Sequence, residues 1–316
     1  MSKEILVLGS SNIDFVLEIP RFHLPGETIL AENLTTVFGG KGANQAIASR
    51  RLGGKVVFMT KLGMDHYGVA YRRYLIENGF GPKWILRDKN LPTGLALIEL
   101  TPAGENRIIV SPGANSSFSQ KDLIRLAPSM KGIKIFVTQL EIPIQTVRAA
   151  LKIFKDQGAV TLLNPSLAIR LSSDLLSLAD FIVPNELEAQ FLTGTKMKRV
   201  RDIPKIAERL LEMGSKNVVI TLGSKGLFFR NKTEEISMKA FRVDVVDTTA
   251  AGDAFMGALA YGLSQDHLLR EVLRLANGAG ALATAKVGAQ PSLPYRRDLD
   301  LFLSRTNGCD SRGRKR

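Results

Sequence analysis

A ten-residue stretch in the last quarter of the chain combines threonines, small residues and a carboxylate in an order that suits chemistry on an anion. It reads Val246-Asp247-Thr248-Thr249-Ala250-Ala251-Gly252-Asp253-Ala254-Phe255. A β-branched run, Val243–Val246, leads into it and apolar residues at helical spacing follow, so we expect a strand, a tight turn and a helix. Asp253 then lies in the first helical turn, where unpaired N–H groups bind anions.

A carboxylate beside an anion site needs an explanation, because like charges repel. Asp253 has one if it takes a proton from a hydroxyl that then attacks a phosphoryl group held by the amides. The structural alternative is an acidic residue that the helix dipole favours at this position. The residues next to Asp253 do not decide between the two, so the other motifs of the chain must.

Polar residues also follow other predicted strands. Asn12 and Asp14 come directly after the first strand, and Glu141 follows a later one. In a doubly wound fold ligands bind beyond the carboxyl ends of the strands, so Asn12 and Asp14 could face a polyol and Glu141 could reach the same cleft. The alternatives are an Asx-rich turn for Gly9–Asp14 and a surface position for Glu141.

A glycine-rich turn precedes a predicted helix over residues 43–52. The segment Gly39–Ala46 contains three glycines and a lysine, but its spacing is not that of a Walker loop. Backbone amides at Gly40 and Gly42, with Asn44 beside them, suit the hydroxyls of a neutral sugar. The alternative is a flexible turn before the helix.

Three segments in the second half of the chain could face a nucleotide or an ion. Asn185 and Glu188 have the spacing of a capping box, but they could also hold Mg²⁺ through water molecules. Thr221–Gly226 either brings its backbone against a nucleotide or forms a hairpin turn. Asn277–Gly288 and the following Gln290-Pro291-Ser292 fit close helix packing, an adenine slot or a ring of carbonyls around a monovalent cation.

Short apolar runs alternate with helical patterns along the chain. The runs cover residues 4–9, 56–59, 133–137, 160–163, 181–183 and 218–222, and the clearest helical patterns cover residues 146–156 and 202–213. This alternation predicts an α/β fold with a doubly wound, mostly parallel sheet that is covered on both faces.

Two segments, residues 14–38 and 94–111, depart from that alternation. The second contains a hairpin signal, with two apolar runs around the turn Pro102-Ala103-Gly104-Glu105. Together they predict a small β-sheet that serves as a lid on a domain of residues 1–304. An exposed sheet of this kind favours a homodimer through the lid. Residues 305–316 are predicted to be a basic, disordered tail.

Composition excludes some classes of protein. No apolar run reaches the roughly 18 residues that a membrane span needs. The first residues lead straight into a strand pattern rather than a signal peptide, and a single cysteine forms no intrachain disulfide, so we expect a cytoplasmic protein. The net charge of +13 is compatible with nucleic-acid binding, but the basic tail contains no aromatic residue for stacking, and no specific nucleic-acid partner is expected.

Several segments of the chain also occur, in this order, in a known family. They are Gly9–Asp14, Pro25–Thr28, Gly39–Gln45, Thr93-Gly94, Gly113–Asn115, Asn185–Glu188, Thr221–Gly226, Asp247–Asp253 and Gly288–Ser292. Together they resemble the ribokinase-like sugar kinases, the PfkB family, over about residues 3–304. The resemblance implies ATP-dependent transfer of the γ-phosphoryl group to the 5-hydroxyl of D-ribose, with Mg²⁺ and K⁺ as further cofactors.

The resemblance also implies a role for each matching residue. Asp253 would be the base, and the anion hole would be formed by the amides of Ala250, Ala251 and Gly252. The sugar would be bound by Asn12, Asp14, Gly40, Lys41, Gly42, Asn44, Glu141 and Asp253. The nucleotide would be bound by Asn185, Thr221, Leu222, Gly223, Ser224, Lys225, Gly226, Gly252 and Asn277. Asn185 and Glu188 would hold Mg²⁺ through water, and the monovalent cation would be held, mostly by backbone oxygens, by Asp247, Thr249, Ala283, Lys286, Gly288 and Ser292.

Two points stay open at this stage. Ala250 stands where many members of the family have glycine; alanine keeps the N–H, so the anion hole is retained if the local φ is negative. The acceptor could also be 2-deoxyribose, another furanose or a nucleoside. From a different class, the chain could be an inert regulator that binds a sugar or a nucleotide on the same scaffold.

Overall fold

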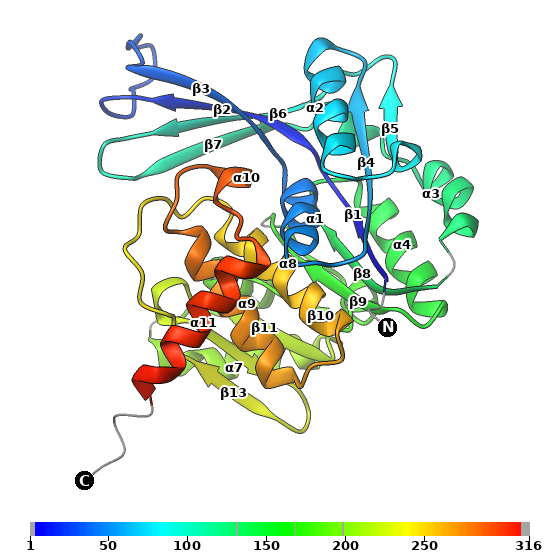
Figure 1. Ribbon diagram of the computed structural model, residues 1–316, viewed down its shortest axis with the longest axis vertical. Coiled ribbons are helices and arrows are strands. Elements are labelled where there is room, and N and C mark those ends of the chain that lie inside the picture. The colour runs from blue at the N-terminus through cyan, green and yellow to red at the C-terminus, as the bar shows by residue number, and fades with distance from the viewer. Residues whose placement is uncertain (1–3, 131, 168, 198, 311–316) are drawn as a thin grey trace.

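A computed structural model describes residues 4–130, 132–167, 169–197 and 199–310 (Figure 1). It contains a nine-stranded sheet between two layers of helices and a second, four-stranded sheet that extends away from it at the upper left of Figure 1. No helix within the described ranges is both long and apolar enough to cross a membrane.

The large sheet is parallel over most of its width. Its strand order is β13-β12-β11-β10-β9-β8-β1-β4-β5. The bounds are β1 Glu4–Leu8, β4 Val56–Gly63, β5 Ile85–Asp88, β8 Ile133–Gln139, β9 Val160–Asn164, β10 Phe181–Ile182, β11 Asn217–Thr221, β12 Leu227–Arg230 and β13 Glu235–Met238. All neighbouring pairs from β5 to β11 are parallel, and β12 and β13 add an antiparallel edge.

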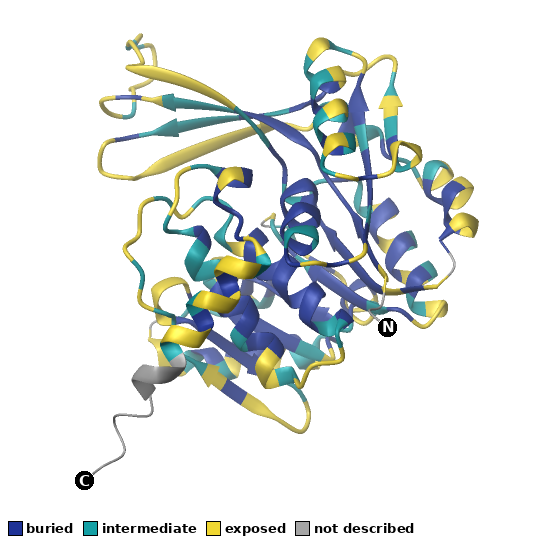
Figure 2. Cartoon of the chain, viewed as in Figure 1, coloured by how far each residue is buried: buried dark blue, intermediate teal, exposed yellow. Residues whose placement is uncertain are grey.

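Continuous apolar runs form the central strands because both faces of the sheet are covered. In β1, Ile5 and Val7 pack in one buried cluster, while Leu6 and Leu8 pack in another. The first cluster includes helices α1 Lys41–Arg51, α2 His66–Glu77, α8 Ala251–Ser264, α9 Leu269–Ala283 and α11 Arg296–Asp310. The second includes α3 Gln120–Leu126, α4 Ile144–Asp156, α5 Ser173–Leu176, α6 Glu186–Thr193 and α7 Ile203–Glu212. The predicted doubly wound architecture is confirmed, and its interior is the dark blue layer of Figure 2.

The small sheet is formed by the two segments that the sequence set apart. Its order is β3-β2-β6-β7, with bounds β2 Asn12–Glu18, β3 Asn33–Gly39, β6 Gly94–Leu100 and β7 Asn106–Ser111. The predicted hairpin is β6–β7, which is antiparallel, whereas β2 and β6 pair in parallel. Since only three residues separate the end of β1 from the start of β2, the start of the lid lies directly above the carboxyl edge of the large sheet.

Two predictions of local structure are wrong. Val243–Val246 is not a strand. The Val246 and Asp247 N–H groups both donate to the Thr284 carbonyl at the end of α9, so this extended segment has a helix terminus as its partner rather than a strand. The predicted boundary at residue 304 also falls inside a helix, because α11 continues to Asp310. Of the predicted tail, residues 311–316 lie outside the described part of the chain.

Candidate active site

Asp253 is held between two helices that approach each other closely. It lies in the first turn of α8, is 5% exposed, and accepts hydrogen bonds from Asn44 Nδ2 (2.9 Å) and Gln45 Nε2 (3.0 Å) of α1. Small residues permit this approach: a Cβ at Gly257 of α8 would lie 2.5 Å from the Ala48 Cβ of α1. The sequence therefore places the carboxylate at a helix start and buries it among amide donors.

The turn before α8 presents backbone donors to open space. Within the described part of the chain, the N–H groups of Ala250 and Gly252 have no hydrogen-bond partner, and the Ala251 N–H makes only a long bond of 3.3 Å to the Thr248 carbonyl. A Cβ at Gly252 would meet nothing within 4 Å. Unpaired donors at an open helix N-terminus are what an anion needs.

Ala250 does not meet the condition that the sequence set for this turn. Its φ is +60° and its ψ is 9°, which lie in the left-handed region. The prediction from the sequence was that the anion hole is retained if this φ is negative. The condition was too strict, because a left-handed residue followed by helical residues directs consecutive N–H groups into one concavity. The turn keeps its donors, and the strain falls on a residue that has a Cβ.

We expect Ala250→Gly to raise the free energy of unfolding by up to about 1 kcal/mol, since the left-handed region costs an L-residue about 1–2 kcal/mol and glycine returns roughly half of that as unfolded-state entropy. Ala251→Gly is the matched control. Ala251 is helical, so the same change there should lower stability by about 0.5–1 kcal/mol. Urea unfolding measures both, and equal losses in the two variants would contradict strain at Ala250.

The predicted sugar residues come together where β1 passes into β2. Asp14 is 7% exposed and Asn12 is 3% exposed, and the Asn12 Oδ1 accepts a hydrogen bond of 2.7 Å from Asn115 Nδ2. Gly39 is required beside them, because a Cβ there would lie 1.9 Å from the Asp14 Oδ2. Gly40, at φ +91°, turns the chain toward α1.

Glu141 and Lys41 complete the polar wall. One oxygen of Glu141 accepts the Ser10 hydroxyl at 2.5 Å and the Lys41 N–H at 3.4 Å. Burial raises the pKa of Asp14 to about 7, and the negative charges of Glu141 and Asp253 add to this effect while Lys41 opposes it. Burial lowers the pKa of Lys41, but the surrounding carboxylates, led by Asp253 and Glu141, raise it above its ordinary value overall. Four acids, Asp14, Glu141, Glu188 and Asp253, therefore share one ammonium group in the cleft.

Most of the predicted nucleotide residues, Asn185 and Thr221–Gly226, lie at the carboxyl ends of β10 and β11. Asn185 and Thr221 are paired as neighbouring extended residues, and the turn Gly223–Lys225 follows. A Cβ at Gly223 would meet nothing within 4 Å, so a planar ligand could lie against this turn. Asn277 donates to the Lys239 carbonyl at 2.8 Å, which fixes α9 against the segment that leads to the anion turn.

The fit of Asn185 and Glu188 to Mg²⁺ depends on what their capping box leaves free. The Glu188 Oε2 accepts the Asn185 N–H at 2.9 Å, and the Asn185 Oδ1 accepts the Glu188 N–H at 2.8 Å, so the structural alternative is present. Among the described residues, the second Glu188 oxygen has no hydrogen-bond partner. Burial raises the pKa of Glu188, the Asn185 N–H and the charge of Lys41 lower it, and Asp253 raises it, so Glu188 faces the cleft. One open carboxylate oxygen suits an ion that keeps most of its water.

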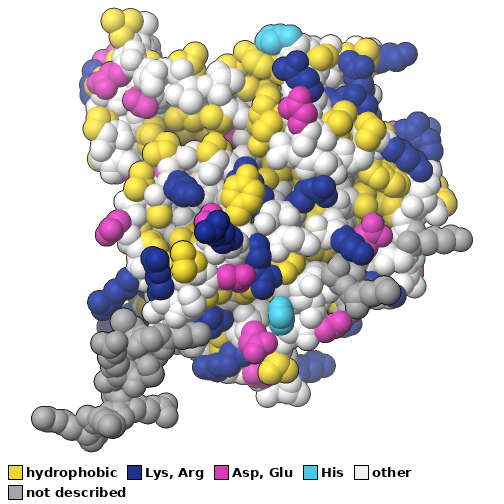
Figure 3. Space-filling view, viewed as in Figure 1, with side chains coloured by type: hydrophobic (Ala, Val, Ile, Leu, Met, Phe, Trp, Pro, Cys, Tyr) yellow, Lys and Arg dark blue, Asp and Glu magenta, His cyan; other side chains and the backbone are white. Residues whose placement is uncertain are grey.

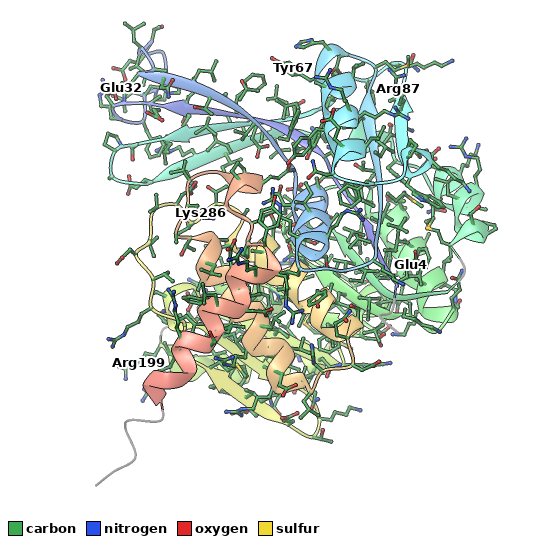
Figure 4. The ribbon with its side chains drawn as sticks, in the orientation of Figure 1. Glu4, Glu32, Tyr67, Arg87, Arg199 and Lys286 are labelled. Atoms are coloured by element: carbon green, nitrogen blue, oxygen red, sulfur yellow. The ribbon has the colours of Figure 1, made fainter. Side chains whose placement is uncertain are left out.

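Asp247 joins the two segments predicted to hold a monovalent cation. Its carboxylate accepts the Thr249 N–H and the Gly288 N–H, both at 2.8 Å. The loop between α9 and α10 (Ala289–Ser292) therefore lies against the anion turn, and Lys286 marks it in Figure 4. No group of three His, Cys, Asp or Glu suited to a metal occurs among the described residues.

Several polar residues of the site carry no role in the predictions from sequence. Gln45, Gln139 and Asn164 lie beneath Asp253, and Ser10 and Asn115 support Glu141 and Asn12. Their common signal is an amide or hydroxyl at the end of a strand or within a glycine-rich turn. That signal could have been read, but amides at strand ends are too frequent to be singled out without the contacts.

Comparison with known proteins agrees with this geometry. A family model described as pfkB family carbohydrate kinase matches residues 2–296. The ribokinase of Staphylococcus aureus (strain COL) is 39% identical over 301 residues, which cover 93% of this chain and 97% of the relative. The ribokinase of Haemophilus influenzae is 38% identical over 303 residues, which cover 96% of this chain and 99% of the relative.

A solved structure supports the same relationship. The structure of Arabidopsis thaliana ribokinase complexed with ribose and ATP has a TM-score of 0.87 and 32% sequence identity, and covers 96% of this chain and 99% of that one. The family model spans nearly the whole described fold, including the lid and the anion turn. The chain therefore belongs to the pfkB family of carbohydrate kinases.

Proposed function

We propose that this protein transfers the γ-phosphoryl group of ATP to the 5-hydroxyl of D-ribose, giving ribose 5-phosphate and ADP. The observation that carries the proposal is the position of Asp253: a buried carboxylate with unpartnered backbone donors on one side and the polar residues Asp14 and Glu141 on the other. A base, an anion site and a polyol site thus share one cleft. The similarity to proteins named ribokinase over nearly their full length points to ribose as the acceptor.

Asp253 takes the proton of the 5-hydroxyl as that oxygen attacks the γ-phosphorus. A new P–O bond forms, the bond from the γ-phosphorus to the bridging oxygen breaks, and ADP leaves with the electron pair. The N–H groups of Ala250 and Gly252 stabilise the negative charge on the phosphoryl oxygens, which is the main requirement of this reaction. Mg²⁺, held through water by Glu188 and Asn185, would neutralise phosphate charge when bound.

The remaining residues orient the sugar and exclude water. Asn12, Asp14 and Glu141 supply acceptors for ring hydroxyls, and Lys41 balances their charge. Asp14 lies near the start of β2 in the small sheet, so closure of this sheet would cover the reacting groups. Exclusion of water favours sugar over water as the acceptor.

A panel of acceptors tests the proposal. Purified protein with Mg-ATP and K⁺ is given pentoses, hexoses and nucleosides, and ADP release is measured. D-Ribose should have the highest kcat/KM. 2-Deoxyribose should be about 5- to 150-fold poorer, because a buried acceptor that loses its partner costs about 1–3 kcal/mol. A nucleoside with a higher kcat/KM than ribose would mean that the acceptor is a nucleoside. No ADP release with any compound would favour an inert regulator.

We also propose that K⁺ binds between the anion turn and the loop before α10, where Asp247 joins the two segments. A cation there would hold the turn that carries the phosphoryl donors, so it should act on kcat. Replacing K⁺ with Na⁺, and then with a bulky organic cation, is expected to lower kcat progressively. Equal turnover in all three salts at constant ionic strength would contradict a role for K⁺ in the reaction.

The lid supports the proposal of a homodimer. On the face that carries Asp14, Val16, Ile98 and Ile108 are aligned across three strands, and Ile108 is 54% exposed. Figure 3 shows hydrophobic side chains gathered on this part of the surface, at the upper left. An apolar face of this kind is usually covered by a partner.

We expect Ile108→Arg to convert the dimer to a monomer, because a charge would have to be buried in the interface. Light scattering coupled to size exclusion measures the mass. Ile124→Arg is the matched control, since Ile124 is 61% exposed on α3, away from the lid. A wild-type protein with the mass of one chain would refute the dimer.

A further inference from the structure

A chain of side-chain amides underlies Asp253. Gln45 Nε2 donates both to the Asp253 Oδ1 (3.0 Å) and to the Asn164 Oδ1 (3.2 Å). Its Oε1 accepts a hydrogen bond of 2.6 Å from Gln139 Nε2. Asn164 Nδ2 in turn donates to the Val183 carbonyl at 2.9 Å. Gln45 and Gln139 are completely buried, so neither has water as an alternative partner.

The direction of these hydrogen bonds is fixed at the far end of the chain. The Val183 carbonyl only accepts, so Asn164 must direct its NH₂ toward Val183 and its oxygen toward Gln45. Gln45 must then direct its NH₂ toward Asn164, and the same NH₂ reaches Asp253. A flipped Gln45 amide would place its oxygen against two acceptors at once. The backbone of the sheet therefore determines which group Asp253 meets.

Gln139 fixes the opposite side of the same amide. The Gln139 NH₂ donates to the Gln45 Oε1, so no rotation of the Gln45 amide keeps the partners of both its oxygen and its NH₂ group. The sequence leaves room for Gln139: a Cβ at Gly9 would lie 2.0 Å from the Gln139 Oε1. Gln45 is thus held in place by hydrogen bonds to side chains at the ends of β8 and β9.

We propose that Gln45, locked by Gln139 and Asn164, is a positioning residue that holds the Asp253 Oδ1 as a hydrogen-bond acceptor and so orients the carboxylate toward the sugar hydroxyl. This inference rests on the proposed function. Because Asn44 donates to the other oxygen, the carboxylate cannot rotate without losing two bonds. The proton from the sugar then arrives at the lone pairs that the two amides leave open.

The first test replaces Gln45 with methionine, which has nearly the same shape and no donor. A hydrogen bond to a charged group is worth enough that kcat should fall about 10- to 100-fold. KM for ribose should stay within about threefold, since among the described residues the Gln45 side chain hydrogen-bonds to no predicted sugar residue other than Asp253.

The second test separates positioning from simple packing. Gln139→Met leaves Asp253 and its two donors in place and only unlocks Gln45, so a smaller fall in kcat with an unchanged KM for ribose is expected. Ser49→Ala is the matched control: Ser49 is buried in the same helix pair and donates to the Gly257 carbonyl at 2.7 Å, but it does not reach Asp253. It should lower stability and leave both kcat and KM for ribose unchanged.

The outcomes distinguish this inference from the proposed function. If the wild-type protein phosphorylates no sugar, the proposed function fails and the inference fails with it. If the wild type is active but Gln45→Met keeps the wild-type kcat, only the inference fails. Should Gln45→Met not fold, Gln139→Met decides: a kcat equal to that of the wild type would overturn the positioning role.

Discussion

Asp253→Asn should lower kcat for ribose by at least about 100-fold while the sugar still binds. A general base is worth roughly 10²–10⁴-fold in rate, and an amide cannot take a proton from the hydroxyl. The anion turn is unaffected, because its donors are backbone N–H groups of Ala250 and Gly252. Sugar binding should survive, since Asn12, Asp14 and Glu141 come from other strands and loops. Steady-state kinetics and calorimetric titration with ribose measure the two effects.

Asparagine places an uncharged side chain of the same shape at position 253, so the fall in kcat measures the loss of the base. Asparagine turns one NH₂ toward the donors of Asn44 and Gln45, so some loss of stability accompanies the loss of rate. Asp244→Asn controls for the change of charge, because Asp244 is exposed in the segment that leads to the anion turn. Turnover of Asp253→Asn within tenfold of the wild type would reject Asp253 as the base.

Asp14→Asn should stabilise the free protein at pH 8 and weaken its use of ribose. The pKa of Asp14 is raised to about 7 by burial and by the neighbouring acids, from an ordinary value of 3.8. A raised folded-state pKa gives stability that is fully present below pH 4 and is lost as the pH rises through 7. At about 1.4 kcal/mol per pH unit, the charged carboxylate costs up to about 4 kcal/mol at pH 8, and asparagine avoids that cost.

Thermal unfolding without ligand, at pH 8 and at pH 4.5, measures the difference. The variant should have the higher Tm at pH 8, and the gap should close at pH 4.5. Asp88→Asn is a control of opposite sign. The Ser117 hydroxyl and two backbone N–H groups lower the pKa of Asp88 to about 2, so its stabilisation is present above pH 4 and is lost as the pH falls through 2. A lower Tm for Asp14→Asn at pH 8 would contradict the cost assigned to Asp14.

The same substitution should raise KM for ribose by about 10- to 100-fold, because a hydrogen bond between a charged group and a hydroxyl is replaced by a weaker one. Stability and binding then change in opposite directions at one residue. This is expected of a carboxylate that is kept in a buried site for its ligand rather than for the fold.

Features set by neighbouring residues could be predicted from the sequence. The strand β1 follows from a run of residues buried on both faces, and the hairpin β6–β7 follows from two apolar runs around a short turn. The position of Asp253 follows from the change from small residues to helical spacing. Each depends on sterics and hydrophobic periodicity within about ten residues.

Features set by distant residues could not be predicted. Gln45 and Gln139 are 94 residues apart, and Gln45 and Asn164 are 119 apart, so no local pattern indicates that their amides meet. Val243–Val246 has strand propensity, but the partner that tertiary structure supplies is the end of a helix. The positive φ of Ala250 is likewise imposed by the surrounding turn against the preference of alanine.

The most direct test of the central claim is the ³¹P NMR spectrum of the product formed from Mg-ATP and D-ribose. Transfer to the 5-hydroxyl places phosphorus next to a CH₂ group, so the new phosphomonoester signal should be a triplet that appears as ADP accumulates and is absent with Asp253→Asn. A doublet would place the phosphate on a carbon with a single proton, and ADP with only inorganic phosphate would mean hydrolysis. Either result would contradict a cleft in which Asp253 activates the 5-hydroxyl of ribose.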